Sequence, residues 1–262
     1  MPSANSPDPS IDWDGLERNR TRPDGKPAMF QTWHDLIFLH SAVAPSILRQ
    51  LVPKQFEVET YGGDGWLGFV PFRMSQVRPS SLFALPWLSN FHETNLRTYV
   101  THPKYGPGVW FFSLEAARYL ACLVARQSFK LPYFHGRLSS KIDGPRWHYE
   151  GERNRNQFLP SLDIQSGDLT SYSVTVENER AWFQAEPKTF EYWLVERYRL
   201  YSLGAMNQPF TAMVHHEPYI VARANVLDLR IEGLEKQFQN LAFTNVLVAK
   251  TLSVECFSPV RL

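Results

Sequence analysis

Residues 92–100, HETNLRTYV, have an unusual composition for a strand, because chemically capable side chains alternate along them. Successive side chains of a strand point to opposite faces, so Glu93, Asn95, Arg97 and Tyr99 share one face. That face meets either solvent or a cavity. The heavily apolar runs on both sides favour a cavity, in which Arg97 would hold an anion and Glu93 would bind or protonate a ligand.

Arg197 is a charged residue on an otherwise apolar face of an expected helix. Helical spacing over Thr189–Tyr201 gathers a stripe made of Phe190, Trp193, Leu194, Tyr198 and Tyr201. Arg197 lies near the centre of that stripe, where a guanidinium is costly unless a carboxylate pairs with it. Glu93 is one candidate partner. Both a structural ion pair and a ligand-binding Arg197 remain open.

The stretch at 116–138 joins an expected helix to a turn that contains proline. Its candidate functional groups are Arg126, Tyr133 and His135. Lys130 would become a nucleophile only if it were desolvated, since burial lowers the pKa of a lysine. Between two apolar neighbours, a lysine that reaches out to solvent is the more common case.

Metal, nucleotide and cofactor chemistry lack their usual motifs. His215 and His216 are adjacent, and neighbouring histidines rarely reach one metal ion together. Two cysteines, Cys122 and Cys256, are too few for a disulfide framework or a multi-thiolate site. No glycine-rich phosphate loop, dinucleotide fingerprint or nucleophile elbow is present. We expect no metal and no cofactor, and we keep His216 as a candidate ligand-binding residue.

These groups need elements to position them. We expect helices over Pro45–Leu51, Leu114–Gln127 and Thr189–Tyr201. Short segments rich in aromatic and β-branched residues predict strands over Gly65–Phe72, His92–Val100, Gly108–Phe112, Arg146–Glu150, Leu169–Glu177, Tyr219–Leu229 and Thr251–Phe257. Many strands with a few scattered helices indicate an α+β protein built on a large antiparallel sheet or barrel-like core.

Composition bounds the remaining choices. The 262 residues include 27 basic and 26 acidic ones, a balance that argues against a nucleic-acid partner. No apolar run approaches the ~18 residues of a membrane span, and the polar start lacks a secretion signal, so we expect a cytoplasmic protein. Residues 1–28, rich in proline and charge, predict a mobile tail, and 29–262 predict a single domain. Only 8 of the 27 basic residues are Lys.

Taken together, several segments resemble the YqjF-like family, bacterial proteins with a domain of unknown function. The resemblance covers roughly residues 30–258 and rests on the order of the following stretches: FLHSAV (38–43), LRQLVP (48–53), GWLGFVPFRM (65–74), FHETNLRTYV (91–100), GVWFFSLEA (108–116), ARQSFKLPY (125–133), YEGER (149–153), FEYWLVERYRLY (190–201) and VHHEPY (214–219).

That family is similar in fold to acetoacetate decarboxylase, and the resemblance implies an internal pocket. In the decarboxylase, one of two adjacent lysines after a proline forms a Schiff base with a β-keto acid. Here Tyr133 and Phe134 follow Pro132 at those positions, while Glu93 matches an acid of the decarboxylase pocket. The resemblance therefore implies a pocket that retains the acid and lacks the nucleophile. It also makes a homo-oligomer possible.

Three hypotheses follow. In the first, the protein binds a small organic acid or carbonyl compound and acts on it, with Glu93 and Tyr133 as catalytic groups. Arg97, Asn95, Arg126, His135, Arg197 and His216 are the candidate ligand-binding residues. In the second, the same arginine grip serves a non-catalytic module that senses or carries a metabolite. In the third, the acidic and basic groups form a buried ion-pair network without a ligand.

Overall fold

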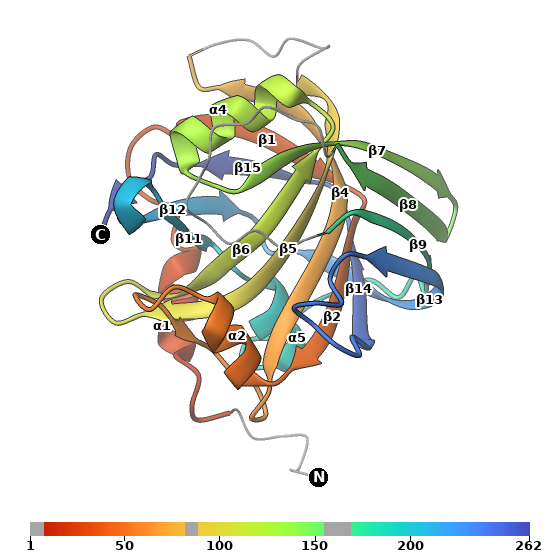
Figure 1. The fold of residues 1–262 in the computed structure, drawn as a ribbon, viewed down its shortest axis with the longest axis horizontal. Helices are drawn as coiled ribbons and strands as arrows, with labels where there is room; N and C mark the ends of the chain where they lie inside the picture. Colours follow the sequence, from red (N-terminus) through yellow and green to blue (C-terminus); the bar gives the residue numbers. More distant parts are fainter. Residues whose placement is uncertain (1–7, 82–88, 155–168) are drawn as a thin grey trace.

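The structure is a computed structural model that describes residues 8–81, 89–154 and 169–262. Its helices are α1 (Trp13–Arg20), α2 (Pro45–Leu51), α4 (Tyr119–Phe129) and α5 (Phe190–Val195), with a short 3-10 turn at Ala205–Asn207. α4 lies at one end of the molecule, and α1, α2 and α5 lie toward the other (Figure 1). The expected helix over Pro45–Leu51 is confirmed.

The strands make up most of the fold. They are β1 (Met29–His34), β2 (Leu36–Val43), β3 (Glu57–Val58), β4 (Gly65–Pro79), β5 (Phe91–His102), β6 (Gly106–Ala116), β7 (Tyr133–Asp143), β8 (Arg146–Arg153), β9 (Ser171–Asn178), β10 (Phe183–Gln184), β11 (Arg199–Leu203), β12 (Pro209–His216), β13 (Ile220–Glu232), β14 (Phe243–Ala249), β15 (Leu252–Cys256) and β16 (Val260–Arg261). All seven expected strands are present, several of them longer than predicted. The α+β class and the large sheet are confirmed.

One continuous sheet of 16 strands organises the chain. Besides the main strand order, β1 pairs with β4 and β5 pairs with β6. These extra pairings close the sheet into two rings that share β4, β5 and β6. One ring continues through β11, β12, β15 and β1, and the other through β7, β8, β9, β13, β14 and β2.

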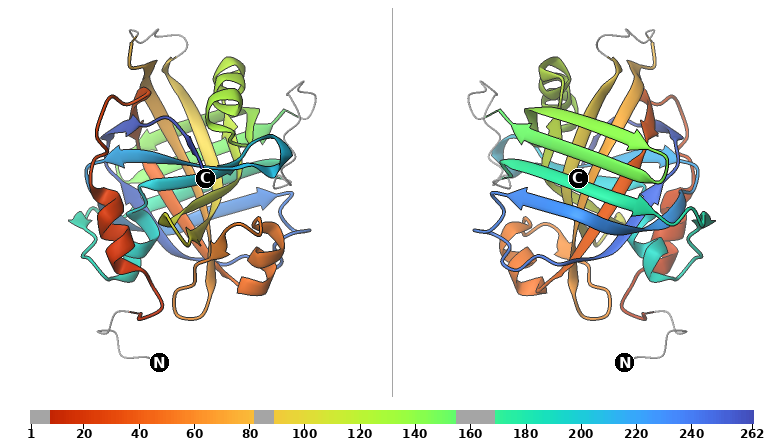
Figure 2. Two further views of the ribbon diagram at one scale, coloured as in Figure 1. Left: turned by 90° about the vertical axis from the view of Figure 1, so that its left-hand side faces the viewer. Right: turned by 90° about the vertical axis from the view of Figure 1, so that its right-hand side faces the viewer.

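The shared strands form a central layer. β11 and β12 cross one face of it, and β7, β8, β9 and β13 cross the other (Figure 2). The expectation of an antiparallel sheet is wrong in two places, because β6 runs parallel to both β7 and β11. Each of those pairs is joined by a long connection, as parallel pairing requires.

Two hydrophobic cores lie on the two faces of this layer. Tyr99 of β5 belongs to one core, while Leu96 and Val100 belong to the other. From Glu93 to Val100, every residue of β5 is buried. The polar alternation of this strand therefore distributes side chains between two interiors and not between an interior and solvent.

Two of the expected helices are shorter than predicted. Leu114–Ala116 extend β6, so the helix expected over Leu114–Gln127 begins only at Tyr119. The helix expected over Thr189–Tyr201 starts correctly, with the Thr189 hydroxyl accepting from the Tyr192 amide, but it ends at Val195. Arg199–Leu203 form β11, since pairing with β6 and β12 outweighs the helical spacing of the apolar residues.

The segment expected as a mobile tail contains α1. The Asp12 side chain caps this helix by accepting from the Gly15 amide at 2.8 Å. Trp13 and Leu16 are buried in the first core, and the Asn19 amide donates to the Pro107 carbonyl at 2.8 Å. The low apolar content of this segment did not predict α1, because few apolar residues suffice for a helix that packs onto an existing sheet. Residues 1–7 lie outside the described part of the chain.

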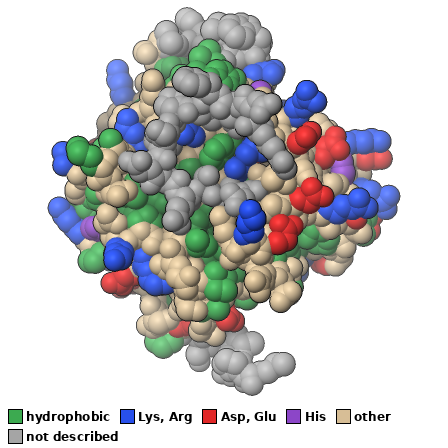
Figure 3. All heavy atoms as spheres, viewed as in Figure 1, with side chains coloured by type: hydrophobic (Ala, Val, Ile, Leu, Met, Phe, Trp, Pro, Cys, Tyr) green, Lys and Arg blue, Asp and Glu red, His purple; other side chains and the backbone are tan. Residues whose placement is uncertain are grey.

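Charged side chains of both signs are interspersed on the face over β7 and β8 (Figure 3). Within the described part of the chain, no helix combines the length and the hydrophobicity that a membrane span requires.

The packing of α1 leads to a stability prediction. Leu16→Ala removes a side chain that is 1% exposed, so we expect it to lower the free energy of unfolding by about 2–4 kcal/mol. Arg18→Ala, on the exposed side of the same helix, is expected to change it by less than about 0.5 kcal/mol. Urea unfolding followed by fluorescence measures both. Equal midpoints for the two variants would show that α1 does not contribute to the fold.

Candidate functional site

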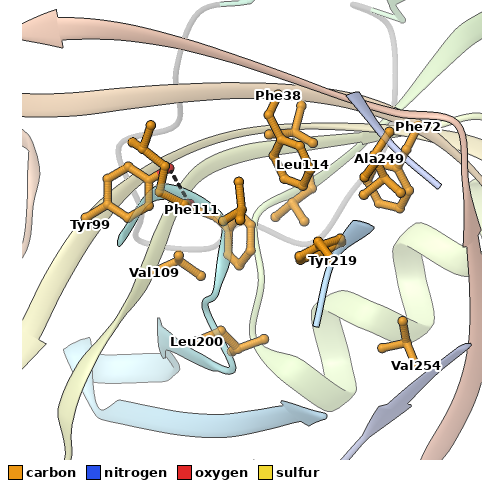
Figure 4. Packing of buried hydrophobic residues seen from close by; sticks show 14 of the residues in the cluster. Phe38, Phe72, Tyr99, Val109, Phe111, Leu114, Leu200, Tyr219, Ala249 and Val254 are labelled. Carbon is orange, nitrogen blue, oxygen red and sulfur yellow. Dashed lines mark hydrogen bonds between the residues drawn. The ribbon is translucent and has the colours of Figure 1, made fainter. Parts of the chain in front are cut away.

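A cavity of about 300 Å³ lies inside the first ring of strands. Its walls come from β1, β2, β4, β5, β6, β11, β12 and β15, and α4 covers one end. Phe38, Phe111 and Tyr219 point toward one another across this interior (Figure 4). The lining is predominantly apolar with a few polar groups, which is typical of a small-molecule site.

The polar lining comes mainly from one strand. Glu93, Asn95 and Arg97 of β5 all face the cavity, and Tyr133 at the start of β7 faces it as well. The alternating face of residues 92–100 thus meets a cavity and not solvent. Glu93 and Arg97 are the only charged residues among the described residues that line it.

Glu93 is a buried acid with one strong partner. The Tyr133 hydroxyl donates to Glu93 Oε2 at 2.8 Å. Burial raises the pKa of Glu93 to about 8, partly opposed by this hydrogen bond, and the nearby Glu115 carboxylate raises it further. Burial and Glu93 also raise the pKa of the Cys256 thiol, which lines the same cavity, to about 12. At neutral pH, Glu93 is therefore mostly a neutral acid in an apolar environment.

Arg97 has the opposite character. Its side chain is buried, and the carbonyl of Leu194 accepts a long hydrogen bond of 3.4 Å from Nη2. The guanidinium carbon lies 5.4 Å from the centre of the Phe38 ring. The Nε atom has no hydrogen-bond partner, and no carboxylate in the described residues forms an ion pair with Arg97. A buried cation without a counter-ion is costly, so this group is suited to binding an anion.

Two further buried polar residues lie near Arg97, of which Asn95 lines the cavity and His40 does not. The side-chain oxygen of Asn95 is buried and has no hydrogen-bond partner in the part of the chain that the structure describes. His40 lies close to Arg97, and burial together with the positive charge of Arg97 lowers its pKa to about 3. His40 is therefore neutral and does not compete with Arg97 for an anion.

Arg197 is not part of this cavity. Its Nη1 pairs with Glu59 in a contact that is almost completely buried, and its Nε donates to the Trp193 carbonyl at 2.6 Å. Glu93, one candidate partner for Arg197, is not the residue it pairs with, because α5 ends before Arg197 and the chain turns toward Glu59, which follows β3. Arg197 serves here as half of a structural ion pair.

The other candidates also lie outside the lining. Arg126 donates to the Tyr133 carbonyl at 2.7 Å and so holds α4 against β7. His135 contacts the Tyr119 ring. His216 lies between Tyr198, on which it stacks, and Tyr219, whose ring is tilted against it, with ring centres 4.4 and 4.5 Å away. Each of these residues acts on the walls of the site and does not face the cavity.

Sequence reasoning missed several lining residues. Tyr219, Gln31, Trp33 and Cys256 face the cavity from strands or from the segment before one. Only Tyr219 lay in a segment that the resemblance had marked, and nothing in its spacing distinguished it from an ordinary core residue. Among the described residues, no three His, Cys, Asp or Glu side chains gather in a way that would hold a metal ion.

Comparison with known proteins shows the family to which this chain belongs. Residues 30–252 match the family model DUF2071, described as an uncharacterized conserved protein. The chain belongs to this family. It is 38% identical over 208 residues to the uncharacterized protein YqjF of Bacillus subtilis, an alignment that covers 79% of this chain and 81% of the relative.

Solved structures agree on the fold. An acetoacetate decarboxylase-like enzyme from Sphingomonas wittichii is similar with a TM-score of 0.62 at 11% identity, over 91% of this chain and 94% of that one. The acetoacetate decarboxylase of Legionella pneumophila has a TM-score of 0.62 at 10% identity, over 98% of both chains. The enduracididine biosynthesis enzyme MppR, solved with pyruvate, has a TM-score of 0.58 at 11% identity, over 92% of both chains. The expected acetoacetate-decarboxylase-like fold is confirmed.

The buried pair of Arg197 and Glu59 leads to a stability prediction. Arg197→Met leaves Glu59 buried without a partner, so we expect the free energy of unfolding to fall by about 3 kcal/mol or more at pH 7. Arg73→Met, which breaks the more exposed pair with Asp35, should cost at most about 1 kcal/mol. Urea unfolding compares them, and adding Glu59→Gln to Arg197→Met should recover part of the loss. Similar costs for the two single variants would contradict this role.

The raised pKa of Glu93 predicts a pH dependence of stability. Between about pH 5 and pH 8 the unfolded chain ionises Glu93 while the folded protein keeps it protonated, so this residue destabilises the fold as pH rises. We expect Glu93→Gln to gain stability over the natural protein by up to about 1.4 kcal/mol per pH unit across this range, with no further gain above it. Unfolding curves at several pH values measure the difference. For the exposed control Glu179→Gln, the difference in free energy of unfolding from the natural protein should not change with pH. The same result for Glu93→Gln would refute the raised pKa of Glu93.

Proposed function

We propose that the cavity binds a small organic acid that carries a carbonyl group and catalyses proton transfer on it without a covalent intermediate. The observation that carries the proposal is Arg97, a buried guanidinium that faces a mostly apolar cavity and has no counter-ion among the described residues. A bound carboxylate would supply the missing charge and accept the free N–H groups. An apolar wall beside it would exclude water and strengthen that contact.

Glu93 and Tyr133 would perform the chemistry. In its ionised form, Glu93 removes a proton from a carbon next to the carbonyl of the ligand. The electron pair of that C–H bond forms a C=C bond, and the carbonyl oxygen becomes an enolate. As Glu93 takes up the proton, the Tyr133 hydroxyl turns from Glu93 and donates its hydrogen bond to the enolate oxygen. Glu93 then returns the proton to the same or another carbon. Because the pKa of Glu93 is about 8, both of its forms are populated near neutral pH.

The lysines support a mechanism without an iminium. All eight lysines lie in the described residues, and none lines the cavity. Seven are exposed, and the half-buried Lys130 folds back so that its Nζ donates to the Gln127 carbonyl at the end of α4. At the place where the resemblance to the decarboxylase implies a nucleophilic lysine, the cavity has the Tyr133 hydroxyl.

The ligands of one structural neighbour agree with this substrate class. MppR was solved with pyruvate and with the condensation product of pyruvate and imidazole 4-carboxaldehyde. Those compounds combine a carboxylate with a carbonyl or with a product of carbonyl chemistry. At 11% identity this likeness bears on the fold, so the ligand class for this chain rests on Arg97, Glu93 and Tyr133.

A non-catalytic carrier or sensor is the second candidate. It is favoured by the lining, which apart from a few polar groups is apolar and holds no charges other than Glu93 and Arg97 in its described part. Such a module needs the Arg97 contact but no proton transfer, so it predicts binding that survives replacement of Glu93.

Deuterium exchange separates the two candidates. Isomeric oxooctanoates with the oxo group at carbon 2, 4 or 7 are incubated with the protein in D₂O, and loss of the C–H signals beside the carbonyl is followed by NMR. We expect exchange of at least one isomer to rise about tenfold per pH unit below pH 8 and to level off above it, since only the ionised Glu93 accepts a proton.

Variants assign the roles. We expect Glu93→Gln to lose at least 100-fold in exchange rate while calorimetry still detects binding, and Arg97→Met to lose binding at least tenfold. Arg73→Met removes an arginine outside the cavity and should change neither. Binding without exchange that depends on Glu93 would favour the carrier, and neither binding nor exchange would refute both candidates.

A further inference from the structure

The two charged groups of the cavity lie far apart along one strand. Glu93 and Arg97 share a face of β5 with only Asn95 between them on that face. At a rise of about 3.3 Å per residue, their Cα atoms are about 13 Å apart. The guanidinium of Arg97 does not fold back toward Glu93, because it lies 5.8 Å from the Tyr99 ring and donates to the Leu194 carbonyl. One ligand that touches both groups must therefore be elongated.

Apart from Asn95, the wall between these ends is apolar. Val70 and Phe72 of β4 stand opposite Asn95 and Glu93 in the register of the sheet, and Leu114 of β6 stands opposite Asn95. All three line the cavity, as do Phe38 and Phe111 near Arg97. A ligand lying along β5 thus meets a charge-binding group at one end, apolar side chains along its length, and the Glu93–Tyr133 pair farther along.

The size of the cavity agrees with that length. A volume of about 300 Å³ is about ten times the ~30 Å³ that one water molecule occupies in the liquid, so it accommodates about ten groups of that size. An extended chain of six C–C bonds of ~1.5 Å, which advances somewhat less than a full bond length per bond, spans about 8 Å. With a hydrogen bond of about 3 Å at each end the total is about 14 Å, comparable with the Cα separation of about 13 Å between Glu93 and Arg97, whose side chains project from the same face of β5.

The orientation follows from the charges. The Arg97 end is the deeper one, since α4 residues at the opposite end, Leu120 and Val124, line the cavity and are each 47% exposed. Arg97 is the only cationic residue in the described lining, so the ligand carries one carboxylate and not two. Its remaining polar group faces the Glu93–Tyr133 pair, where the Tyr133 hydroxyl suits the carbonyl oxygen and Glu93 meets the carbon beside it.

We propose that the substrate is a monocarboxylate whose reacting carbonyl is separated from the carboxylate by an apolar spacer of about five carbons. This inference rests on the proposed function and specifies its substrate class. It departs from compounds such as pyruvate, in which the two groups are adjacent and only one of them would reach its partner at a time. The proton that Glu93 moves belongs to a carbon beside the distant carbonyl.

Three isomers of equal composition test the spacing. The protein in its natural form is incubated in D₂O with 2-oxooctanoate, 4-oxooctanoate or 7-oxooctanoate, and Glu93→Gln supplies the background rate. We expect the Glu93-dependent exchange of the 7-oxo isomer to be at least 30-fold faster than that of the 2-oxo isomer, with the 4-oxo isomer between them. The isomers match in charge and in apolar content, so the rates report the position of the carbonyl.

Each outcome decides one question. If the 2-oxo isomer exchanges as fast as the 7-oxo isomer or faster in a Glu93-dependent manner, the spacing is wrong and the proposed function stands. If no isomer shows Glu93-dependent exchange, the proposed function fails. Octan-2-one, which lacks the carboxylate, tests the anchor: it should exchange at least tenfold more slowly than 7-oxooctanoate, and equal rates would overturn the role of Arg97 in placing the substrate.

Discussion

The burial of β5 on both faces is the constraint on which the rest of this structure depends. A strand that carries Glu93, Asn95 and Arg97 would ordinarily turn that face to water. Here two closed rings of strands share β5, so each face meets its own interior. The polar side chains are consequently desolvated, and each must find a partner, neutralise itself or remain available to a ligand.

Three of the buried charged residues, Arg197, Glu93 and Arg97, resolve that requirement in three ways. Arg197 pairs with Glu59, and the pair stabilises the packing of α5 against the sheet. Glu93 keeps its proton at neutral pH, because burial and the neighbouring Glu115 disfavour the carboxylate. Arg97 does neither in the described part of the chain. Since an arginine cannot release its proton under these conditions, the unbalanced charge remains in the cavity wall. This difference separates a residue that holds the fold together from one that is available for binding.

The sequence predicted much of the fold, and the physical reasons for its failures are specific. Alternation along residues 92–100 was sufficient to place Glu93, Asn95 and Arg97 on one face, because the period of a strand is fixed. The helix over Thr189–Tyr201 was overestimated, because the apolar pattern around Tyr198 fits both a helix and the strand β11, and only pairing with β6 decides between them. β2 has no alternation to detect, since seven of its eight residues are buried. Tyr219 and Cys256 reach the cavity only through tertiary packing, which no local spacing reports.

The shared position of β5 also restricts how this chain can change over evolution. A shift of the strand by one residue would exchange the cavity set, Glu93, Asn95 and Arg97, with Thr94, Leu96 and Thr98 of the second core. A single residue inserted or deleted within β5 would thus damage the site and both interiors together. A two-residue change would restore the facing of every side chain and alter only which neighbours it meets. We therefore expect a change of length within β5 to be tolerated less well in this family than a change in the type of a single cavity residue.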